Sequence, residues 1–279
     1  IREAQDADVL MIANMPLSGR VIRACKHLQF IDVAFTGVDH VDLEAAKEKK
    51  IAVSNASGYS NESVAELVLG MAIDLFRKVP QVEKRCREEN RCRNGGTKDG
   101  LVGNELGSSV VGIVGVGAIG SRVATLCRAF GSTVIGYVPH PSERNRALLT
   151  YVSLEELLQR ADIVTLHCPL TPETRGLIGR EQLALMKPSA YLINMARGPV
   201  VDAQAVADAL NQGKIAGAAI DVFEKEPPLN ADEPLLHAKN CLLTPHIAFA
   251  SHQSMERRAR IVFDSLQQWM NGHQVNKIL

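Results

Sequence analysis

The stretch Gly115-Val116-Gly117-Ala118-Ile119-Gly120 decides the fold of this chain. It follows the β-branched run Val110–Val114 and precedes a segment with helical periodicity, so it places a glycine-rich turn between a strand and a helix. The first glycine permits a tight turn, the second lets a pyrophosphate approach the backbone, and the third lets the helix pack against the strand. The N–H groups and peptide dipoles at a helix start stabilise phosphate charge. The turn therefore predicts dinucleotide binding, since three glycines without a ligand would only weaken both elements.

A doubly wound α/β domain, of the Rossmann type, is expected around this turn. Short apolar strands alternate with helical patterns from residue 109 to residue 243, which is typical of βαβ units and of a parallel sheet with about six strands. The expected strands are Ser109–Val114, Thr133–Tyr137, Ile163–His167, Ala190–Asn194, Gly217–Asp221 and Cys241–Leu243. The expected helices are Ile119–Phe130, Leu154–Arg160, Arg180–Leu185 and Ala203–Gln212.

The flanking sequence predicts a second, smaller α/β domain. Its expected strands are Val9–Ala13, Phe30–Ala34 and Ile51–Val53. Its expected helices are Gly19–His27, Leu43–Lys49, Asn61–Val79 and Ser251–Met270. We assign residues 1–78 and 250–279 to this domain and residues 79–249 to the dinucleotide-binding domain. Because the chain opens in what reads as the end of a helix, we expect a first strand and helix to be missing from the smaller domain. Residues 81–104 are charged and contain glycine, which fits a linker, a disordered loop or an arm that contacts a second subunit.

The composition excludes several classes of protein. The 31 Lys and Arg residues balance 31 Asp and Glu residues, so no net charge attracts nucleic acid or an anionic membrane. Six cysteines without a Cys-x-x-Cys pair favour free thiols in a reducing compartment. The sequence shows no membrane span and no signal peptide, and we expect a cytoplasmic location. Neither a His-Glu-x-x-His motif nor a Cys/His cluster indicates a metal site.

The residues after the second strand of the large domain decide between NAD and NADP. NAD-binding domains usually carry an acid about 20 residues beyond the glycine turn, where it accepts hydrogen bonds from the adenosine ribose. Val138 stands at that place, and the nearest acid, Glu143, lies beside Arg144. His140, Ser142 or Arg144 could favour a 2′-phosphate. NAD is favoured, because no basic residue directly follows the strand, and NADP is not excluded.

Three segments with polar side chains follow expected strands of the large domain. Asn194–Gly198 places Arg197 after one strand, Asp221–Pro227 places acids after the next, and Thr244–His246 places a histidine after the last. The carboxyl ends of parallel strands face the ligand crevice of such a sheet. Each residue alone would be taken for an ordinary surface or core side chain, but their occurrence at successive strand ends favours catalysis.

Together these motifs resemble the D-isomer-specific 2-hydroxyacid dehydrogenases. The match runs over nearly all of the chain, in order and at family spacing. The further matching stretches are Thr36–Asp42, Ser63–Glu66, His167–Thr174 and Met186–Pro188. The resemblance implies a nicotinamide-dependent oxidoreductase of D-2-hydroxy acids, in which a flavodoxin-like smaller domain contributes to substrate binding.

The resemblance also implies a role for individual side chains. Arg197 would bind the carboxylate of a 2-oxo acid and polarise its ketone. His246 would donate a proton to the carbonyl oxygen as hydride arrives from the cofactor. Glu226 would hold the imidazole and keep it protonated near neutral pH. Asp221 would bond the nicotinamide carboxamide, whereas His167 and His252 are expected to be structural.

The remaining contacts implied by the resemblance come from both domains. The expected substrate-binding residues are Met15, Gly37, Val38 and Arg197. The expected cofactor-binding residues are Gly115, Gly117, Ala118, Ile119, Gly120, Val138, Cys168, Pro169, Thr174, Met195, Ala196 and Asp221. Residues 81–104 would contribute to a homodimer contact.

The chain departs from the family pattern at two places. Ile247-Ala248-Phe249 follows the histidine where relatives commonly carry glycines, and Ile12–Leu17 offers nothing to pair with a phosphate dianion. A small 2-oxo acid with an uncharged or mildly apolar side chain is therefore the expected substrate. A second hypothesis is a non-enzymatic module that senses the NADH/NAD ratio and binds partner proteins. A third, a methyltransferase with the same glycine turn, does not explain the Arg, Glu and His set.

Overall fold

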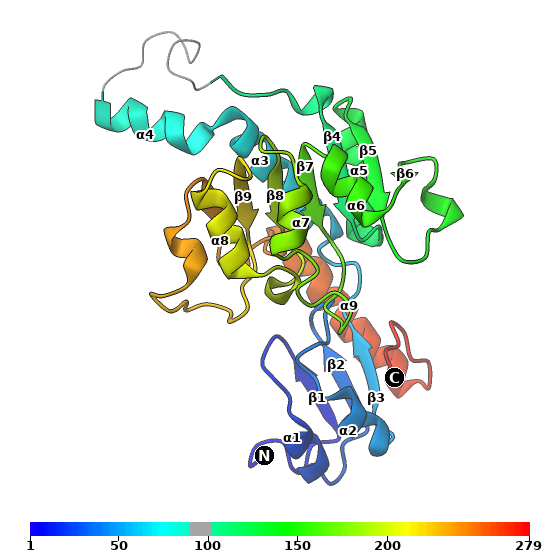
Figure 1. Ribbon diagram of the computed structural model, residues 1–279. Coiled ribbons are helices and arrows are strands. Elements are labelled where there is room, and N and C mark those ends of the chain that lie inside the picture. Colours follow the sequence, from blue (N-terminus) through cyan, green and yellow to red (C-terminus); the bar gives the residue numbers. More distant parts are fainter. Residues whose placement is uncertain (90–101) are drawn as a thin grey trace. The chain divides into compact units, whose positions relative to one another are not determined.

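The computed structural model describes residues 1–89 and 102–279, and the chain forms two compact units (Figure 1). Ile1–Ser60 and Ala250–Leu279 make up the small unit, and Asn61–Phe249 make up the large unit. Both are α/β, as the sequence predicts. The large unit is one continuous segment, whereas the small unit is assembled from both ends of the chain.

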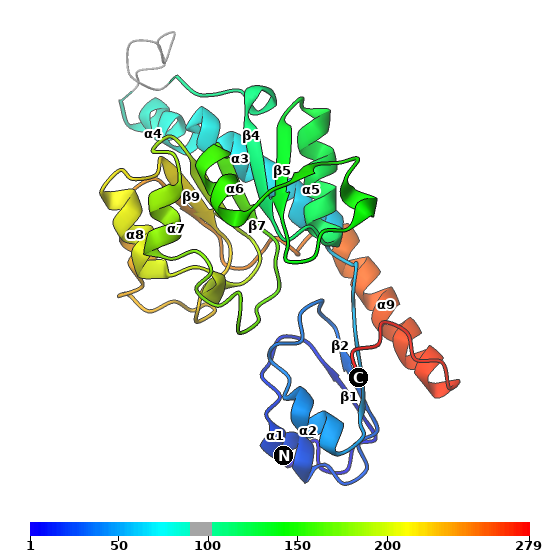
Figure 2. The same cartoon turned by 45° about the vertical axis from the view of Figure 1, so that its right-hand side comes forward.

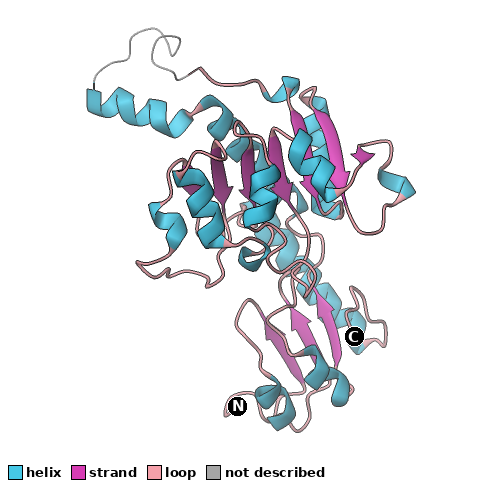
Figure 3. Cartoon of the chain, viewed as in Figure 1, coloured by secondary structure: helices cyan, strands magenta, loops and turns pink. Residues whose placement is uncertain are grey.

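A parallel sheet of seven strands forms the centre of the large unit (Figure 3). The strand order is β10-β9-β8-β7-β4-β5-β6. The direction of winding reverses between β4 and β7, which confirms the doubly wound fold, and such sheets bind ligands at this reversal. The strands are β4 (Val110–Val114), β5 (Thr133–Tyr137), β6 (Thr150–Tyr151), β7 (Ile163–Leu166), β8 (Tyr191–Asn194), β9 (Gly217–Ile220) and β10 (Cys241–Leu243).

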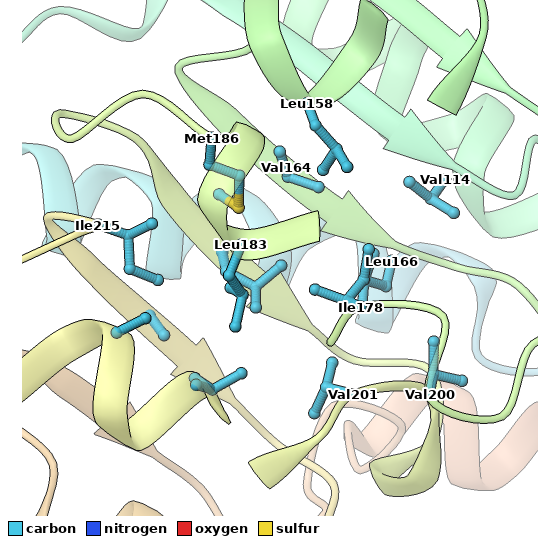
Figure 4. Packing of buried hydrophobic residues seen from close by; sticks show 14 of the residues in the cluster. Val114, Leu158, Val164, Leu166, Ile178, Leu183, Met186, Val200, Val201 and Ile215 are labelled. Atoms are coloured by element: carbon cyan, nitrogen blue, oxygen red, sulfur yellow. The ribbon is translucent and has the colours of Figure 1, made fainter. Parts of the chain in front are cut away.

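Helices cover both faces of this sheet, with α6, α7 and α8 on the near side of the strands and α3 behind them in Figure 1. Val164 and Leu166 of β7 belong to the core under α6, α7 and α8 (Figure 4), whereas Ile163 belongs to the core under α3 and α5. Burial on both faces explains why these strands are continuous apolar runs. The helices are α3 (Asn61–Arg77), α4 (Val79–Glu89), α5 (Ala118–Ala129), α6 (Leu154–Arg160), α7 (Arg180–Leu185) and α8 (Ala203–Asn211), with short 3₁₀ turns at Leu106–Ser108, Glu143–Asn145, Gly198–Val200 and Pro234–His237.

The sheet of the small unit has three parallel strands in the order β1-β2-β3 (Figure 1), and Figure 2 shows β1 and β2 from another side. Ile31 of β2 belongs to a core with α1 and α2, and Phe30 on the same strand stacks on Trp269 of α9 with ring centroids 4.8 Å apart. The end of the chain returns to β3, where Lys277 forms an antiparallel bridge with Ser54. The elements are β1 (Val9–Ile12), α1 (Gly19–Ala24), β2 (Phe30–Val33), α2 (Leu43–Glu48), β3 (Ala52–Asn55) and α9 (His252–Met270).

The boundary between the units lies at residue 60, so the predicted boundary at residue 78 is wrong. α3 packs against α5, and its side chains Val64, Val68 and Leu75 belong to a core of the large unit. The apolar stripe of α3 is plain in the sequence, but a stripe does not say which core it fills.

Two elements were not expected from the sequence. Residues 79–89 form α4, although the charged segment from Gln81 onward has almost no apolar period, and Arg87 pairs with Glu83 one helical turn away. The edge strand β6 has two residues, too few for a recognisable pattern. Residues 90–101 of the expected dimer arm lie outside the described residues. Among the helices that the structure describes, none has the length and apolar character needed to cross a bilayer.

Candidate active site

A left-handed glycine opens the turn after β4. Gly115 has φ +92°, which L side chains rarely adopt, and its N–H donates to Tyr137 O at 2.9 Å. A Cβ on Gly115 would lie 2.5 Å from Cys168 N, so only a glycine fits against the backbone after β7. A Cβ on Gly120 would overlap the carbonyl oxygen of Gly115. The first and third glycines thus have the steric roles that the motif predicts.

Gly117 leaves room where a phosphate is expected. Among the described residues, no atom lies within 4 Å of a Cβ built on Gly117, and no side chain caps the start of α5, whose N-cap is Gly117 itself. The first N–H groups of a helix have no intrahelical acceptor, and they stabilise an anion that binds at the helix N-terminus. The residues present therefore fit the pyrophosphate of a dinucleotide.

The loops on either side of the turn are fixed by side-chain hydrogen bonds. Asn145 donates from Nδ2 to Val116 O at 3.1 Å and so ties the loop after β5 to the turn. After β7, the Thr174 hydroxyl donates to Pro169 O at 2.7 Å. Cys168 is buried, and burial raises the pKa of its thiol. The sequence analysis expects Cys168, Pro169 and Thr174 to contact the cofactor, and the structure shows that the Thr174 hydroxyl also orders its own loop.

A buried asparagine shapes the loop that carries Arg197. Asn194 ends β8, where its Oδ1 accepts from Ala196 N at 3.1 Å and its Nδ2 donates to Arg197 O at 3.0 Å. Met195 and Ala196 are buried within this loop. The Arg197 guanidinium donates from Nη1 to Ala196 O at 2.8 Å. The sequence analysis assigns no role to Asn194, although an amide side chain at a strand end is a signal of this kind of loop.

Gly198 allows the Arg197 loop to contact the loop that leads to Glu226. A Cβ on Gly198 would lie closer than 3.0 Å to the backbone of Phe223 and Glu224. Real Cβ atoms do not approach backbone so closely. The segments that carry two of the expected catalytic residues therefore touch through their main chains.

His246 and Glu226 form an ion pair. His246 Nδ1 lies 3.1 Å from Glu226 Oε2, and the exposed fractions of the two side chains are 28% and 44%. Because Nδ1 faces the carboxylate, Nε2 is the ring nitrogen that can exchange a proton with a substrate. The ring of Phe249 lies edge-on to the imidazole, with centroids 5.6 Å apart. The structure thus brings together the acid and the histidine that the sequence places 20 residues apart.

Asp221 is fully buried, and its carboxylate accepts three hydrogen bonds from the segment after β10. Oδ1 accepts from Thr244 Oγ1 at 2.6 Å and from Ile247 N at 2.8 Å, and Oδ2 accepts from Ala248 N at 2.9 Å. These bonds, and the role of the Thr244 hydroxyl in them, are not evident from the sequence. The expected bond from Asp221 to a nicotinamide carboxamide stays a prediction.

The expected substrate contacts outside Arg197 belong to the small unit. Met15 precedes α1 and is 75% exposed. Gly37 and Val38 lie between β2 and α2, where Val41 N donates to Val38 O at 3.0 Å. The roles of these three residues stay predictions.

The two histidines that are expected to be structural have different surroundings. His167 Nε2 lies 2.9 Å from Thr165 Oγ1, and burial lowers the pKa of His167 to about 4, so this ring is neutral at pH 7. His252 lies on the first turn of α9 and is exposed. Across residues 1–89 and 102–279, no group of His, Cys, Asp and Glu side chains is arranged to hold a metal ion.

A protein-family model matches most of the large unit. Residues 69–248 match the NAD-binding domain of the D-isomer specific 2-hydroxyacid dehydrogenases. The chain belongs to this family. The matched range of this chain contains the glycine turn, Arg197, Glu226 and His246. The resemblance seen in the sequence is confirmed, and so is the prediction of a nicotinamide dinucleotide as cofactor.

Named relatives agree with this family. The chain is 38% identical to D-3-phosphoglycerate dehydrogenase of Methanocaldococcus jannaschii over 100% of this chain and 53% of the relative, so it spans about half the length of that protein. It is 35% identical to hydroxypyruvate reductase of Blautia hydrogenotrophica, over 98% of this chain and 85% of the relative.

Solved structures resemble this chain over nearly its whole length. An acyclic imino acid reductase in complex with NADPH and D-Arg has a TM-score of 0.91 at 28% identity and covers 100% of this chain and 87% of its own. D-lactate dehydrogenase from Aquifex aeolicus, complexed with NAD and lactic acid, has a TM-score of 0.88 at 33% identity and covers 97% of this chain and 85% of its own.

These relatives are named dehydrogenases or reductases, which confirms the prediction of an oxidoreductase. They do not favour the hypothesis of a non-enzymatic NADH sensor, and family membership removes the methyltransferase hypothesis. One of the solved structures holds NAD and the other NADPH, which is consistent with NAD as the favoured cofactor of this chain and with NADP not being excluded.

Proposed function

We propose that this chain catalyses the reversible reduction of a small 2-oxo acid to the D-2-hydroxy acid. The observation that carries the proposal is the ion pair between His246 and Glu226 on a chain with an NAD-binding glycine turn. In this proposal the large unit binds the cofactor, and the small unit contributes Met15, Gly37 and Val38 to substrate binding.

His246 is the proposed proton donor. Glu226 Oε2 lies 3.1 Å from His246 Nδ1, and this contact fixes the orientation of the ring. Nε2 then donates its proton to the carbonyl oxygen of the substrate during reduction. In the oxidative direction the same nitrogen removes the proton from the hydroxyl group, and Glu226 stabilises the imidazolium that forms.

Arg197 is the residue proposed to bind the substrate carboxylate. Its guanidinium carries five N–H donors, and one of them, on Nη1, bonds to Ala196 O. A planar guanidinium matches the two oxygens of a carboxylate, and its charge also polarises an adjacent ketone. Asn194 supports this role, because it fixes the backbone of the loop on both sides of Arg197.

The cofactor is proposed to bind at the turn after β4. Gly115, Gly117 and the start of α5 would hold the pyrophosphate, and Asp221 would contact the carboxamide. When bound, the reduced nicotinamide supplies the hydride that the carbonyl carbon accepts. Val138, directly after β5, offers no carboxylate to an adenosine ribose, so the preference for NAD rests on the absence of a basic residue at the end of the strand. The further contacts proposed for the cofactor are Ala118, Ile119, Gly120, Cys168, Pro169, Thr174, Met195 and Ala196.

A short, uncharged 2-oxo acid is the proposed substrate class. Residues 12–17 of the small unit carry no cationic side chain, so they do not offer a partner to a substrate phosphate. Glyoxylate, pyruvate, hydroxypyruvate and short branched 2-oxo acids fit this requirement. This proposal separates the chain from the phosphoglycerate dehydrogenases among its relatives.

The test is a comparison of NADH and NADPH oxidation with a panel of these 2-oxo acids. We expect turnover with at least one of them, and we expect His246→Ala to lower kcat by about 10²- to 10⁴-fold with little change in cofactor affinity. His252→Ala is the matched control, since this histidine is exposed on α9. A cofactor-binding preparation that turns over no 2-oxo acid would disprove the proposed activity, and an equal loss of turnover and cofactor affinity in His246→Ala would deny His246 its role.

A homodimer in the cytoplasm is proposed for the assembled protein. The described cysteines Cys25, Cys86, Cys127, Cys168 and Cys241 are free, which fits a reducing compartment. The arm at residues 81–104 is the proposed dimer contact, and sedimentation of the intact chain against a variant that lacks residues 81–101 tests it.

A further inference from the structure

The turn that carries His246 has a backbone conformation that its own residues do not favour. His246 has φ +57°, in the left-handed region. For a residue with a Cβ this region costs roughly a tenfold loss of population. Pro245 before it and Ile247 after it supply no side-chain hydrogen bond to the turn. Contacts from other segments must therefore stabilise this conformation.

Asp221 provides most of these contacts. Three consecutive N–H groups donate to it: His246 N to the backbone oxygen at 2.7 Å, Ile247 N to Oδ1 at 2.8 Å and Ala248 N to Oδ2 at 2.9 Å. Thr244 adds its hydroxyl to Oδ1 at 2.6 Å. Asp221 is fully buried, so water does not compete for these bonds. A single carboxylate after β9 thus receives donors from both sides of His246.

Ser63 closes the arrangement from a different part of the chain. It lies on the first turn of α3, 185 residues before Ala248, and its hydroxyl donates to Ala248 O at 2.7 Å. Asp221 accepts from the N–H of the same residue, so both backbone groups of the buried Ala248 are engaged. The segment after His246 is fixed at this point, and the position of the imidazole relative to Glu226 depends on it.

We propose that Ser63, Asp221 and Thr244 form a clamp that positions His246 for proton transfer. The clamp rests on the proposed function, because it acts through His246. None of the three side chains exchanges a proton with the substrate. They are positioning residues, and their effect is to keep Nδ1 of His246 at the carboxylate of Glu226.

Ser63 and Thr244 are the residues to change, because Asp221 is also expected to contact the cofactor. Ser63→Ala and Thr244→Val each remove one hydroxyl, whereas Ser63→Thr and Thr244→Ser retain it. Ser153→Ala is the matched control, since the Ser153 hydroxyl caps α6 in the same unit and has no bond to the clamp.

The experiment measures kcat, KM and cofactor affinity for these variants of the full chain, together with the NMR signals of the His246 ring assigned with His246→Ala. We expect Ser63→Ala and Thr244→Val each to lower kcat about tenfold, with KM and cofactor affinity within about twofold of the original values. The ring signals of His246 should move toward those of an exposed histidine. Ser63→Thr and Thr244→Ser should restore both readouts, and Ser153→Ala should change neither.

Two results would overturn the clamp. One is an unchanged kcat and unchanged His246 signals in folded Ser63→Ala and Thr244→Val, which would make the hydroxyls ordinary packing groups. The other is a loss of thermal stability that the hydroxyl-retaining variants share. If the original chain turns over no 2-oxo acid, the proposed function fails, while the His246 signals still decide whether the clamp holds the imidazole.

Discussion

Replacement of Gly198 by alanine tests whether the contact between two loops sets the catalytic geometry. The added Cβ would lie closer than 3.0 Å to the main chain of Phe223 and Glu224. Carbon atoms in ordinary contact are about 3.5 Å apart, so the Arg197 loop and the Glu226 loop must separate by more than about 0.5 Å. The neighbours are backbone atoms, which cannot rotate away as a flexible side chain does.

The expected loss of activity follows from this displacement. Catalytic groups have to stay within about 0.5 Å of their working positions, and a misplacement of about 1 Å costs about 10²-fold. We therefore expect kcat/KM of Gly198→Ala to fall between about 10-fold and 100-fold, or about 1.4 to 2.7 kcal/mol of transition-state stabilisation. Overpacking should also lower the stability of the large unit by about 1 to 3 kcal/mol.

The assay follows oxidation of the reduced cofactor at varied 2-oxo acid concentration, with circular dichroism to establish that the variant is folded. Gly70→Ala is the matched control, because Gly70 lies in α3 and, apart from its chain neighbours and the backbone of its own helix, no atom of the described residues comes within 4 Å of the added Cβ. It should keep full activity and gain about 0.5 to 1 kcal/mol of stability. A folded Gly198→Ala variant with unchanged kcat/KM would show that the contact between the Arg197 loop and the Glu226 loop does not set the catalytic geometry.

Three further substitutions test other parts of the structure. Burial raises the pKa of Asp32 from 3.8 to about 6, so the folded small unit binds this proton more tightly than the unfolded chain does. The free energy of unfolding of the small unit should therefore fall by about 2 to 3 kcal/mol as the pH rises from about 4 to 8. Asp32→Asn should abolish this loss, which urea titrations followed by the fluorescence of Trp269 would measure. Trp269→Ala should destabilise the small unit by about 3 kcal/mol, because Trp269 stacks on Phe30 at 4.8 Å, and a thermal melt would contradict this with an unchanged midpoint. Lys187→Met should cost about 1 kcal/mol or less through loss of the half-exposed pair with Asp162 at 2.8 Å, a loss that disappears in high salt if the pair is electrostatic.

Sequence patterns located most of the elements because their signals are local. Thr133–Tyr137, Leu154–Arg160, Arg180–Leu185 and Cys241–Leu243 have the bounds that periodicity and caps predict. The glycine turn is also a local pattern in the sequence, although its steric reasons are only partly local. A Cβ on Gly120 would overlap the nearby Gly115 O, whereas a Cβ on Gly115 would overlap the backbone at Cys168 after β7. Prediction failed at α3, where the sequence shows an apolar face but not the core that receives it.

The candidate site was predictable as a set of residues but not as an arrangement. Family motifs point to Arg197, Glu226 and His246 individually. The left-handed conformation of His246 depends on the register between β9 and β10. The same register places the N–H groups of residues 246, 247 and 248 at Asp221. The bond from Ser63 depends on where α3 packs. Such non-local geometry leaves no pattern in a linear sequence, so the family motifs Ser63–Glu66 and Thr244–His246 contain the two hydroxyls without indicating what they bond to.

The split composition of the small unit has a consequence for synthesis on the ribosome. β2 is translated before the large unit, whereas Trp269, which stacks on Phe30, and Lys277, which bridges to β3, are translated after it. Residues 61–249 are contiguous and can complete their sheet before residues 250–279 leave the exit tunnel. Until α9 is translated, the face of the small sheet that α9 covers is exposed to solvent. During this interval the exposed apolar side chains of β2 are a binding site for chaperones.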